Sequence, residues 1–560
     1  MRLQYSLVSF PVVFSAMELM GTIQKEVDLS MKKLNLAVMV LLVVALLTGI
    51  ACAAEKSFVY NLRVEPRTID PVLNNAVDGS NVIFNIFEGL VRIGLDDAPE
   101  PGHAESWEVS EDGLTWTFHL RKDLKWSDGV PMTAEHFRYG FLRLLDAENA
   151  SPYAHYGFFV KNGEAFYNGK AKAEDVGFEV VDNTTFVMKL EYQSPLLLDY
   201  MSYHIFYPAR PEIVEKDPRG WTSKSDTIVC NGPFMLTDWQ HNSEMTIKKN
   251  PHYWDAGNVK IDSVRMVMIT DTNTALAAFK AGKIDFMKDP PSPLLPQLLK
   301  SGEAKVAPTL GTSFSVFHVS KPPFDDVRVR KAFSLAVDRT ALVEKVTMGG
   351  QKPAVAYIPY GIPGGTKEKD FRAEGKDFLP VKADVETAKK LLAEAGYPDG
   401  KGFPKVSYKY NINPLNKAIA EALQAMWKQN LGVEIELINE EWKVFIDTRA
   451  QHNFDLARHA YLVDFFDAGS LMELWLTGTY ENYAEYSNPE YDKLVKATLS
   501  EMDPVKRIGY FHQAEEILMN DAVVLPLYFY ATPYMVSSKV KGIYQSPRNW
   551  DFFRAAEVVE

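Results

Sequence analysis

The sequence has almost no cysteine. Its 560 residues contain only Cys52 and Cys230, and Cys52 lies in the leader segment described below. Cys230 is therefore left without a partner in the mature chain, which excludes an intramolecular disulfide. We predict that Cys230 is a buried structural thiol.

The sequence also lacks an excess of basic residues. It contains 60 Lys and Arg against 73 Asp and Glu, a net charge of −13. Nucleic-acid binding needs a basic surface that neutralises phosphates. The charge balance therefore excludes nucleic acid as an expected partner.

Enzyme motifs are missing as well. The sequence has no HExxH, no GxSxG, no GxxxxGK[ST] and no cysteine pair with zinc spacing. Its 11 histidines are scattered, and the acidic pairs Asp96-Asp97 and Asp325-Asp326 are typical of a turn and of a helix start. We predict no catalytic residue, no cofactor and no metal site.

Long hydrophobic runs are absent except for one. Lys32-Lys33 precede an apolar run over 36–47, and small residues follow it. The run is short for a membrane span but typical of a secretory signal peptide, which we place at 31–54. We therefore expect a periplasmic protein. We interpret 1–30 as a mis-assigned upstream start before Met31, because codons for Lys25-Glu26-Val27 can form a ribosome-binding site.

The end of this leader allows two forms of processing. Gly49-Ile50-Ala51-Cys52 resembles a lipoprotein box but lacks the usual leucine three residues before the cysteine. Ordinary cleavage after Ala53 or Ala54 fits the small-residue rule equally well. Anchoring as a lipoprotein through Cys52 and release of a free protein both stay open.

The remaining chain is long enough for two or three domains and alternates helices with strands. Asp384 is expected to cap a helix that ends at Gly396. A second helix runs through 418–426 to Gly432, and 433–437 alternates like a strand. Repeated helix, glycine and strand units predict an α/β fold. Aromatic residues make up 12% of the chain, a share that suits either a ligand cleft or a large core.

Residues 104–137 carry the most informative motif. They read AESWEVSEDGLTWTFHLRKDLKWSDGVPMTAEHF. The stretch predicts a half-buried strand over 115–120, a turn at Asp128-Gly129 and a helix capped by Thr133. The pattern closely resembles the signature of the family 5 extracellular solute-binding proteins, whose best-known members bind oligopeptides for ABC importers. Further segments match the same family, namely 66–71, 85–90, 231–234 and 250–254.

This resemblance implies a fold and its division. The expected fold is α/β, of the type II periplasmic-binding-protein kind, with two lobes, two hinge crossings near 310 and 531, and an inserted third domain. Lobe I would comprise 55–88, 214–310 and 532–560. The inserted domain II would comprise 89–213, and lobe III would comprise 311–531.

The resemblance also implies a binding site. A segment of the form Glu-Trp-Lys…Asp-Thr-Arg…Phe-Asp-x-Ala-Arg occupies 441–458 and leads to Asp464, which would hold a peptide's α-ammonium. Arg458 matches the position that meets the ligand's carboxylate, and an arginine paired with an interior acid is the alternative. Tyr461 would offer backbone groups to the peptide. Further expected contacts, from the same matching, are Trp442, Tyr153, Leu462, Phe314, Asn75, Asn416 and Tyr530.

Several of these positions depart from the family pattern. Gly311 and Leu462 occupy positions that a well-studied member joins by a disulfide. Phe314 replaces a tyrosine, and Asn75 replaces an acidic residue near the ligand's amino end. Asn416 and Thr347 stand where other members bind carboxylates through His and Lys. The resemblance therefore implies capture of the amino terminus and leaves the preferred peptide length open.

The predicted function is an oligopeptide-binding component of an ABC importer, a monomer that passes short peptides to a permease in the inner membrane. Related proteins bind dipeptides, nickel, opines or sugars, and these ligands stay as alternatives. A signalling or chaperone-like binder of the same fold also stays open. A secreted hydrolase with an aromatic groove is disfavoured by the missing nucleophile motifs.

Overall fold

The computed structural model describes residues 19–26, 29, 31–32, 38–39, 55–366 and 369–559. It divides the chain into two compact units, Met1–Glu55 and Lys56–Glu560. Cys52 and most of the predicted signal peptide lie outside the described residues, so those predictions stay predictions. Within the ranges that the structure describes, no helix is both long and apolar enough to cross a bilayer.

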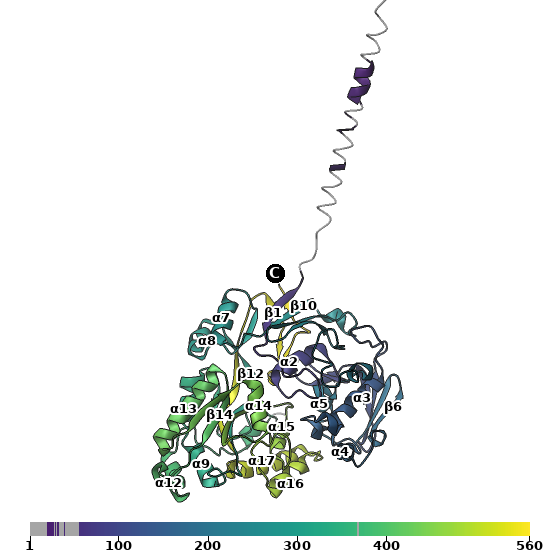
Figure 1. Cartoon of the computed structure of the whole chain (residues 1–560). Helices are drawn as coiled ribbons and strands as arrows, with labels where there is room; N and C mark the ends of the chain where they lie inside the picture. Colours follow the sequence, from purple (N-terminus) through teal and green to yellow (C-terminus); the bar gives the residue numbers. More distant parts are fainter. Residues whose placement is uncertain are drawn as a thin grey trace, which may run out of the picture. The chain divides into compact units, whose positions relative to one another are not determined.

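The second unit is built around one 11-stranded mixed sheet (Figure 1). Its order is β15-β14-β16-β12-β17-β11-β1-β10-β9-β8, and β13 pairs with β17 outside this path. The strands in that order are Glu436–Glu440, Ser407–Asn411, Leu456–Leu462, Lys305–Phe317, Val524–Val536, Phe286–Lys288, Ser57–Asn61, Ser263–Val267, Glu244–Lys249 and Phe234–Gln240, and β13 is Lys352–Pro353. The mixed helix and strand composition confirms the predicted α/β class.

Two long antiparallel strands, β12 and β17, join the two ends of this sheet. Their pairing runs from Lys305↔Tyr534 to Pro308↔Ala531, then shifts register before Thr312↔Phe529. β11 pairs with β17 from Tyr534 to Val536. β16 pairs with β12 from Gly311 to Phe317, at the opposite end of this pair of strands. The register shift therefore lies beside 310 and 531, where the sequence predicted the two crossings.

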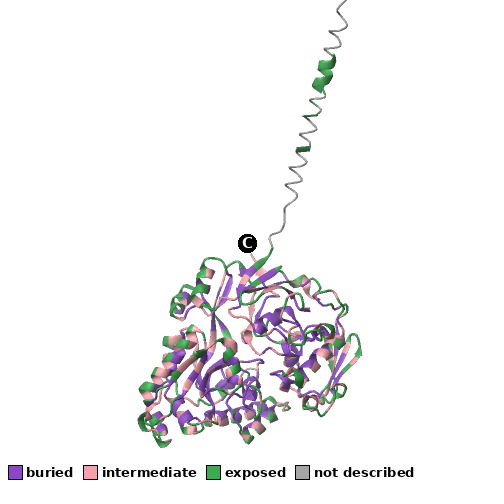
Figure 2. Cartoon of the chain, in the orientation of Figure 1, coloured by how far each residue is buried: buried purple, intermediate pink, exposed green. Residues whose placement is uncertain are grey.

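The buried residues form separate cores at the two ends of the sheet (Figure 2). One core collects residues from 58–286 and 540–556. Two others collect residues of 310–528, one on each face of β12: Phe314 and Val316 pack on one side and Phe317 on the other. This alternation follows from the two-residue repeat of a strand and gives helix, sheet and helix layers. Phe465 is an exception, because it lies in the first core although its chain segment belongs to the second half.

The motif at 104–137 folds as the sequence predicts. β5 (Thr115–Leu120) lies in a four-stranded sheet of order β4-β5-β7-β6, with β4 at Ala104–Val109, β7 at Thr185–Lys189 and β6 at Phe178–Asp182. α3 (Ala134–Leu145) begins after Thr133. The Thr133 N–H donates to His136 Nδ1 at 3.0 Å, so a histidine takes the place usually held by Glu in a capping box.

Helix ends in the second half also agree with the sequence, with one correction. Asp326 caps α9 (Val327–Leu335), Asp384 caps α12 (Val385–Glu394), and α13 (Pro414–Leu431) ends at Gly432 with φ 72°. The predicted strand over 433–437 begins only at Glu436. Val433 and Ile435 are buried, but β14 starts at Ser407, which pairs with Glu436, so the preceding residues have no strand beside them.

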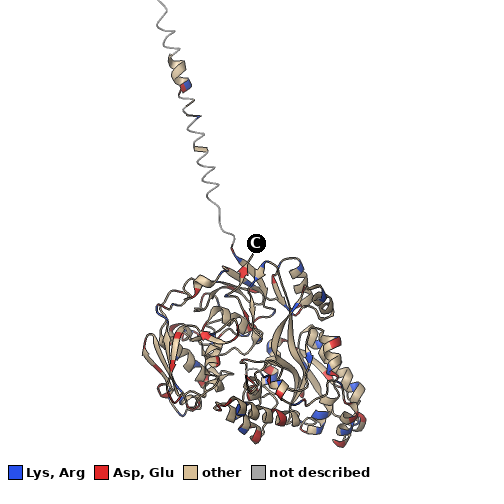
Figure 3. Ribbon diagram, turned by 180° about the vertical axis from the view of Figure 1, so that it is seen from behind, with Lys and Arg blue, Asp and Glu red and all other residues tan. Residues whose placement is uncertain are grey.

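Further helices complete the unit. α2 (Val77–Ile86) follows the first strand, and α14 (Trp442–Ala450) precedes β16. The remaining α-helices of four or more residues in the described part of this unit are α4 Gly163–Tyr167, α5 Leu197–Ser202, α6 Pro211–Val214, α7 Thr272–Lys280, α8 Leu295–Ser301, α11 Phe371–Glu374, α15 Gly469–Met472, α16 Pro489–Thr498 and α17 Pro504–Asn520. Acidic and basic residues are interspersed along these elements (Figure 3).

Cys230 is buried and unpaired among the described residues, as predicted. Burial raises the pKa of its thiol to about 12. A thiol with so high a pKa stays protonated at neutral pH and is a poor nucleophile. Cys230 is therefore a packing residue.

Candidate functional site

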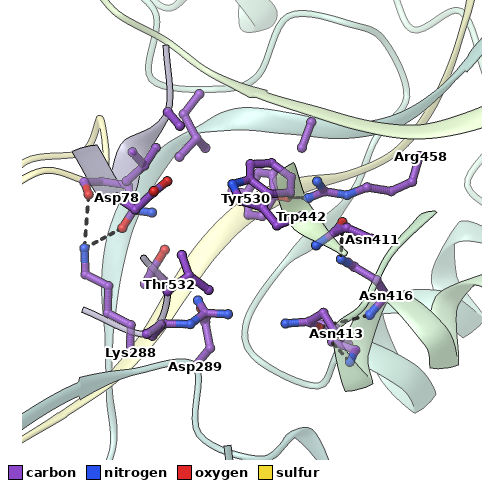
Figure 4. A pocket seen from close by; sticks show the side chains of 18 of the residues that line it. Asp78, Lys288, Asp289, Asn411, Asn413, Asn416, Trp442, Arg458, Tyr530 and Thr532 are labelled. Carbon is purple, nitrogen blue, oxygen red and sulfur yellow. Dashed lines mark hydrogen bonds and ion pairs between the residues drawn. The ribbon is translucent and has the colours of Figure 1, made fainter. Parts of the chain in front are cut away.

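A cavity of about 930 Å³ lies between the two halves of the second unit (Figure 4). Its size is in the range of small-molecule binding sites. The walls come from the end of β1, the start of α2, residues 288–294, the starts of α13 and α14, β16 and β17. The predicted binding residues that line it are Asn75, Tyr153, Asn416, Trp442, Arg458, Tyr461, Leu462, Asp464 and Tyr530.

Asp464 is a buried carboxylate in this wall, two residues beyond β16. Its Oδ1 accepts a hydrogen bond from the Tyr203 hydroxyl at 2.9 Å, and its Oδ2 accepts one from the Tyr461 hydroxyl at 2.7 Å. No cation forms an ion pair with it among the described residues. Burial raises the pKa of Asp464 to about 7, against the lowering effect of the two hydroxyls. A positive charge brought to this point would favour the ionised carboxylate.

Glu481 is a second buried carboxylate that the sequence reasoning missed. Its Oε1 accepts a hydrogen bond from Asn75 Nδ2 at 3.1 Å, and it lines the same cavity. Burial raises the pKa of Glu481, and its charge also raises the pKa of Asp464. By the family resemblance, Asn75 stands where other members have an acidic residue near the ligand's amino end. The structure brings a carboxylate to that asparagine from another segment, which no local pattern in the sequence signals.

Arg458 and Arg449 also line the cavity. Arg458 Nη2 donates to the Tyr530 hydroxyl at 3.2 Å, and among the described residues it forms no ion pair with an acid. Arg449, in α14, donates to His459 Nδ1 at 2.9 Å. Burial and the two guanidinium groups lower the pKa of His459 well below its usual value, so this histidine is neutral at physiological pH. The described residues thus show no interior acid paired with Arg458, and its contact with a ligand carboxylate stays a prediction.

Aromatic and amide groups complete the walls. Trp442 begins α14, whose N-cap Glu441 accepts from the Lys443 N–H at 2.8 Å. Tyr153 is buried, with its ring 5.6 Å from that of Tyr156. Asn416 Nδ2 donates to Asn411 Oδ1 at 2.9 Å at the start of α13. These groups offer flat apolar faces and amide donors without a fixed charge.

Phe314 is the predicted residue that the structure does not bring to the cavity. Its side chain is fully buried. Its ring stacks on His459 with 4.7 Å between the ring centroids and lies edge-on to Tyr357 with 5.3 Å between the centroids. Its place in β12 directs it into the core under the cavity wall. Phe314 therefore supports His459 from behind, and the prediction that it contacts ligand is corrected.

Gly311 and Leu462 lie directly opposite each other in the pairing of β12 with β16. A Cβ added at Gly311 would lie 2.5 Å from Leu462 Cδ2 and 2.5 Å from the Tyr461 carbonyl oxygen. The leucine side chain thus fills the space on the glycine side. Glycine at 311 therefore leaves room for both the leucine side chain and the facing backbone.

One edge of β16 is open beside the cavity. β14 pairs with β16 only at Leu456 and Ala457. From Arg458 to Leu462 the described residues place β12 on one edge and no strand on the other. Such an edge offers main-chain donors and acceptors to an extended peptide.

Metal binding finds no support in the described part of the chain. Within 55–366 and 369–559 no group of three or more His, Cys, Asp or Glu side chains is placed to hold a metal ion. The carboxylates of the cavity belong to separate segments and bond to tyrosine or asparagine.

Comparison with known proteins identifies the family. The family model for bacterial extracellular solute-binding proteins, family 5 (middle region), matches residues 98–483. The chain belongs to this family. It is 37% identical to the dipeptide-binding protein DppE of Bacillus subtilis, over 88% of this chain and 90% of the relative.

Solved structures of the family confirm the type II periplasmic-binding-protein fold. The Haemophilus influenzae OppA complex with the peptide RPPGFSPFR superposes with a TM-score of 0.84 at 33% identity, covering 90% of this chain and 99% of OppA. The Escherichia coli murein tripeptide-binding protein MppA gives 0.83 at 31% identity, covering 91% and 99%. The unliganded open form of MppA gives only 0.64, covering 91% and 98%. The relative placement of the two halves is thus nearer to that of the peptide complex than to the open form.

Proposed function

We propose that this protein is the extracytoplasmic peptide-binding component of an ABC importer, without enzymatic activity, and that it encloses short peptides between two lobes. The observation that carries the proposal is the pair Asp464 and Glu481. Two buried carboxylates without a basic ion-pair partner are costly to keep ionised. A ligand ammonium placed between them removes that cost, which suits a peptide with a free amino terminus.

The rest of the cavity suits the rest of a peptide. The open edge of β16 provides backbone pairing that does not depend on side chains. Arg458 has a guanidinium free of acidic partners and suits the peptide's carboxylate. Trp442 and Tyr153 provide flat apolar walls that tolerate different side chains. Neither a nickel ion nor a sugar would use an ammonium site and a carboxylate site together.

Closure of the lobes rests on contacts between the two halves. Tyr203 donates a hydrogen bond to Asp464, and Asn75 donates one to Glu481. The rings of Phe465 and Tyr200 pack with 4.9 Å between their centroids. The domain limits we propose remain 55–88, 214–310 and 532–560 for lobe I, 89–213 for domain II and 311–531 for lobe III. Ligand that touches both halves would favour the closed arrangement, which the permease would recognise.

The proposed location is the periplasm, reached through the signal peptide at 31–54 and either free or anchored through Cys52. Its partners would be short peptides and the inner-membrane permease, with the protein acting as a monomer. Intact mass of the exported protein separates the two forms. A lipid adduct on an N-terminal Cys52 indicates anchoring, and a chain beginning after Ala53 or Ala54 indicates cleavage.

Native mass spectrometry tests the function directly. The protein would be purified without denaturation, its bound ligands released in the gas phase, and the released species sequenced. We expect mixed peptides of two to five residues with free amino termini. A metal ion or sugar as the sole ligand would contradict peptide binding, and turnover of added peptides would revive the hydrolase alternative.

A further inference from the structure

Asp78 is an acidic residue of the cavity that no step above uses. It is the second residue of α2 and lies in a run, Asn75 to Asp78, that lines the cavity. Its Oδ2 is buried and has no hydrogen-bond partner among the described residues. In Figure 4 Asp78 and Arg458 lie on opposite sides of the view, with Trp442 and Tyr530 between them.

Other acids of the cavity wall are already neutralised. Asp289 is ion-paired with Arg63, and Glu421 lies 3.8 Å from Lys417. Asp464 and Glu481 are the two carboxylates assigned above to the ligand's ammonium. Asp78 is thus a third carboxylate that the cavity leaves without a cation.

Asp78 belongs to a different segment from the ammonium pair, because it lies on α2. The cations that act on it are Lys443, Arg63 and Arg67, and of these Arg67 also acts on Glu481. None of the three cations reaches it as an ion pair within the described residues, and Arg63 is held by Asp289. Burial outweighs their lowering effect and raises the pKa of Asp78 to about 7.

The surroundings fit a long side chain that ends in a cation. Val77, Ile446 and Trp442 line the same cavity and offer apolar surface to a methylene stem. The unpartnered Asp78 carboxylate in the same cavity would accept a charge-assisted hydrogen bond from an ammonium or guanidinium. An uncharged side chain of equal length would leave the carboxylate unpaired.

We propose that Asp78 makes this cavity selective for peptides with a lysine or arginine side chain at one position. The inference rests on the proposed peptide-binding function and adds a side-chain preference to it. The residue is a specificity determinant and takes no part in holding the peptide's termini.

Calorimetry with a positional series tests the preference. The probes are tetra-alanine and tetra-alanine variants with lysine, or norleucine of equal length, at each of the four positions, at pH 8. At one position we expect the lysine peptide to bind the unmodified protein about tenfold more tightly than the norleucine peptide. Asp78→Asn keeps the side-chain shape and should reduce this ratio to about threefold or less, while tetra-alanine binding confirms that the variant is folded.

A matched control and the pH dependence sharpen the result. Glu386→Gln removes an exposed carboxylate of α12 that lies outside the cavity wall, and it should keep the full lysine preference. Lowering the pH to 5.5 protonates Asp78 before ligand binds, so the preference should shrink even though Lys443, Arg63 and Arg67 keep their charges.

The outcomes separate this inference from the proposed function. Equal affinities for lysine and norleucine at every position, with tetra-alanine still bound, would overturn the role of Asp78 alone. A lysine preference that survives Asp78→Asn would do the same. No binding of any peptide by the unmodified protein would overturn both proposals.

Discussion

At the scale of single residues, the proposed peptide binding depends on carboxylates that are buried without a cation. Asp464→Asn keeps the hydrogen-bonding shape and removes the charge. We expect the affinity for a peptide with a free amino group to fall by about 2–5 kcal/mol, as when one partner of a buried charge pair is removed. Isothermal titration calorimetry measures the change. Phe314→Leu, in the core behind the wall, is the comparison and should lose far less affinity; an unchanged affinity in Asp464→Asn would remove this residue from the site.

Glu481→Gln tests the carboxylate that the sequence did not reveal. Its loss should weaken binding of the same peptide, and it should also lower the pKa of Asp464, because Glu481 raises that pKa in the unmodified protein. The pH profile of peptide affinity for Glu481→Gln should therefore shift toward lower pH. A profile that does not move would show that the two carboxylates act independently.

The pKa of Asp464 also predicts how affinity varies with pH. Without ligand its pKa is about 7, and a bound ammonium favours the ionised form and lowers that pKa. Below pH 7 binding must therefore release a proton, and affinity should fall by up to about tenfold per pH unit. Calorimetry in buffers of different ionisation enthalpy measures this proton release. Uptake of protons on binding near pH 6 would contradict the assignment.

At the scale of elements, the open edge of β16 is the feature under test. A peptide that pairs with this edge loses a hydrogen bond when the amide that faces the strand is N-methylated. We expect one or two positions of a methyl scan to lose affinity by about 1–3 kcal/mol each, with little change at the alternate positions that face away. Equal losses at all positions would indicate that the ligand is not extended along β16.

Some helices and strands could be predicted from the sequence and others could not. Capping residues and glycines placed α3, α12 and α13 correctly, because those signals are local. The strand predicted over 433–437 began late, since pairing depends on where β14 starts. Asp464 was predicted from the family pattern of the residues before it. The role of Glu481 could not be predicted, because it depends on a contact with Asn75, which is distant in the sequence. Phe314 was assigned to the cavity by family resemblance, whereas its place in the alternation of β12 turns its side chain into the core.

At the scale of the whole molecule, the proposed peptide binding requires an open form that closes on ligand. The cross-contacts from Tyr203 and Phe465 should hold the closed form only weakly without peptide. Phe465→Ala removes a ring that packs in the other half's core, so it should favour the open form and weaken peptide binding. Small-angle scattering measures the radius of gyration, which should fall on peptide addition in the unmodified protein. A radius that is the same with and without peptide would contradict hinge closure.

If the buried carboxylates recognise the peptide's ammonium, masking that amine must weaken binding. One peptide is therefore compared in two forms, with a free amino terminus and with an N-acetyl group. Calorimetry with the unmodified protein should show the acetylated peptide binding at least about 30-fold more weakly, the factor that corresponds to about 2 kcal/mol. Equal affinity for the two forms would contradict the account.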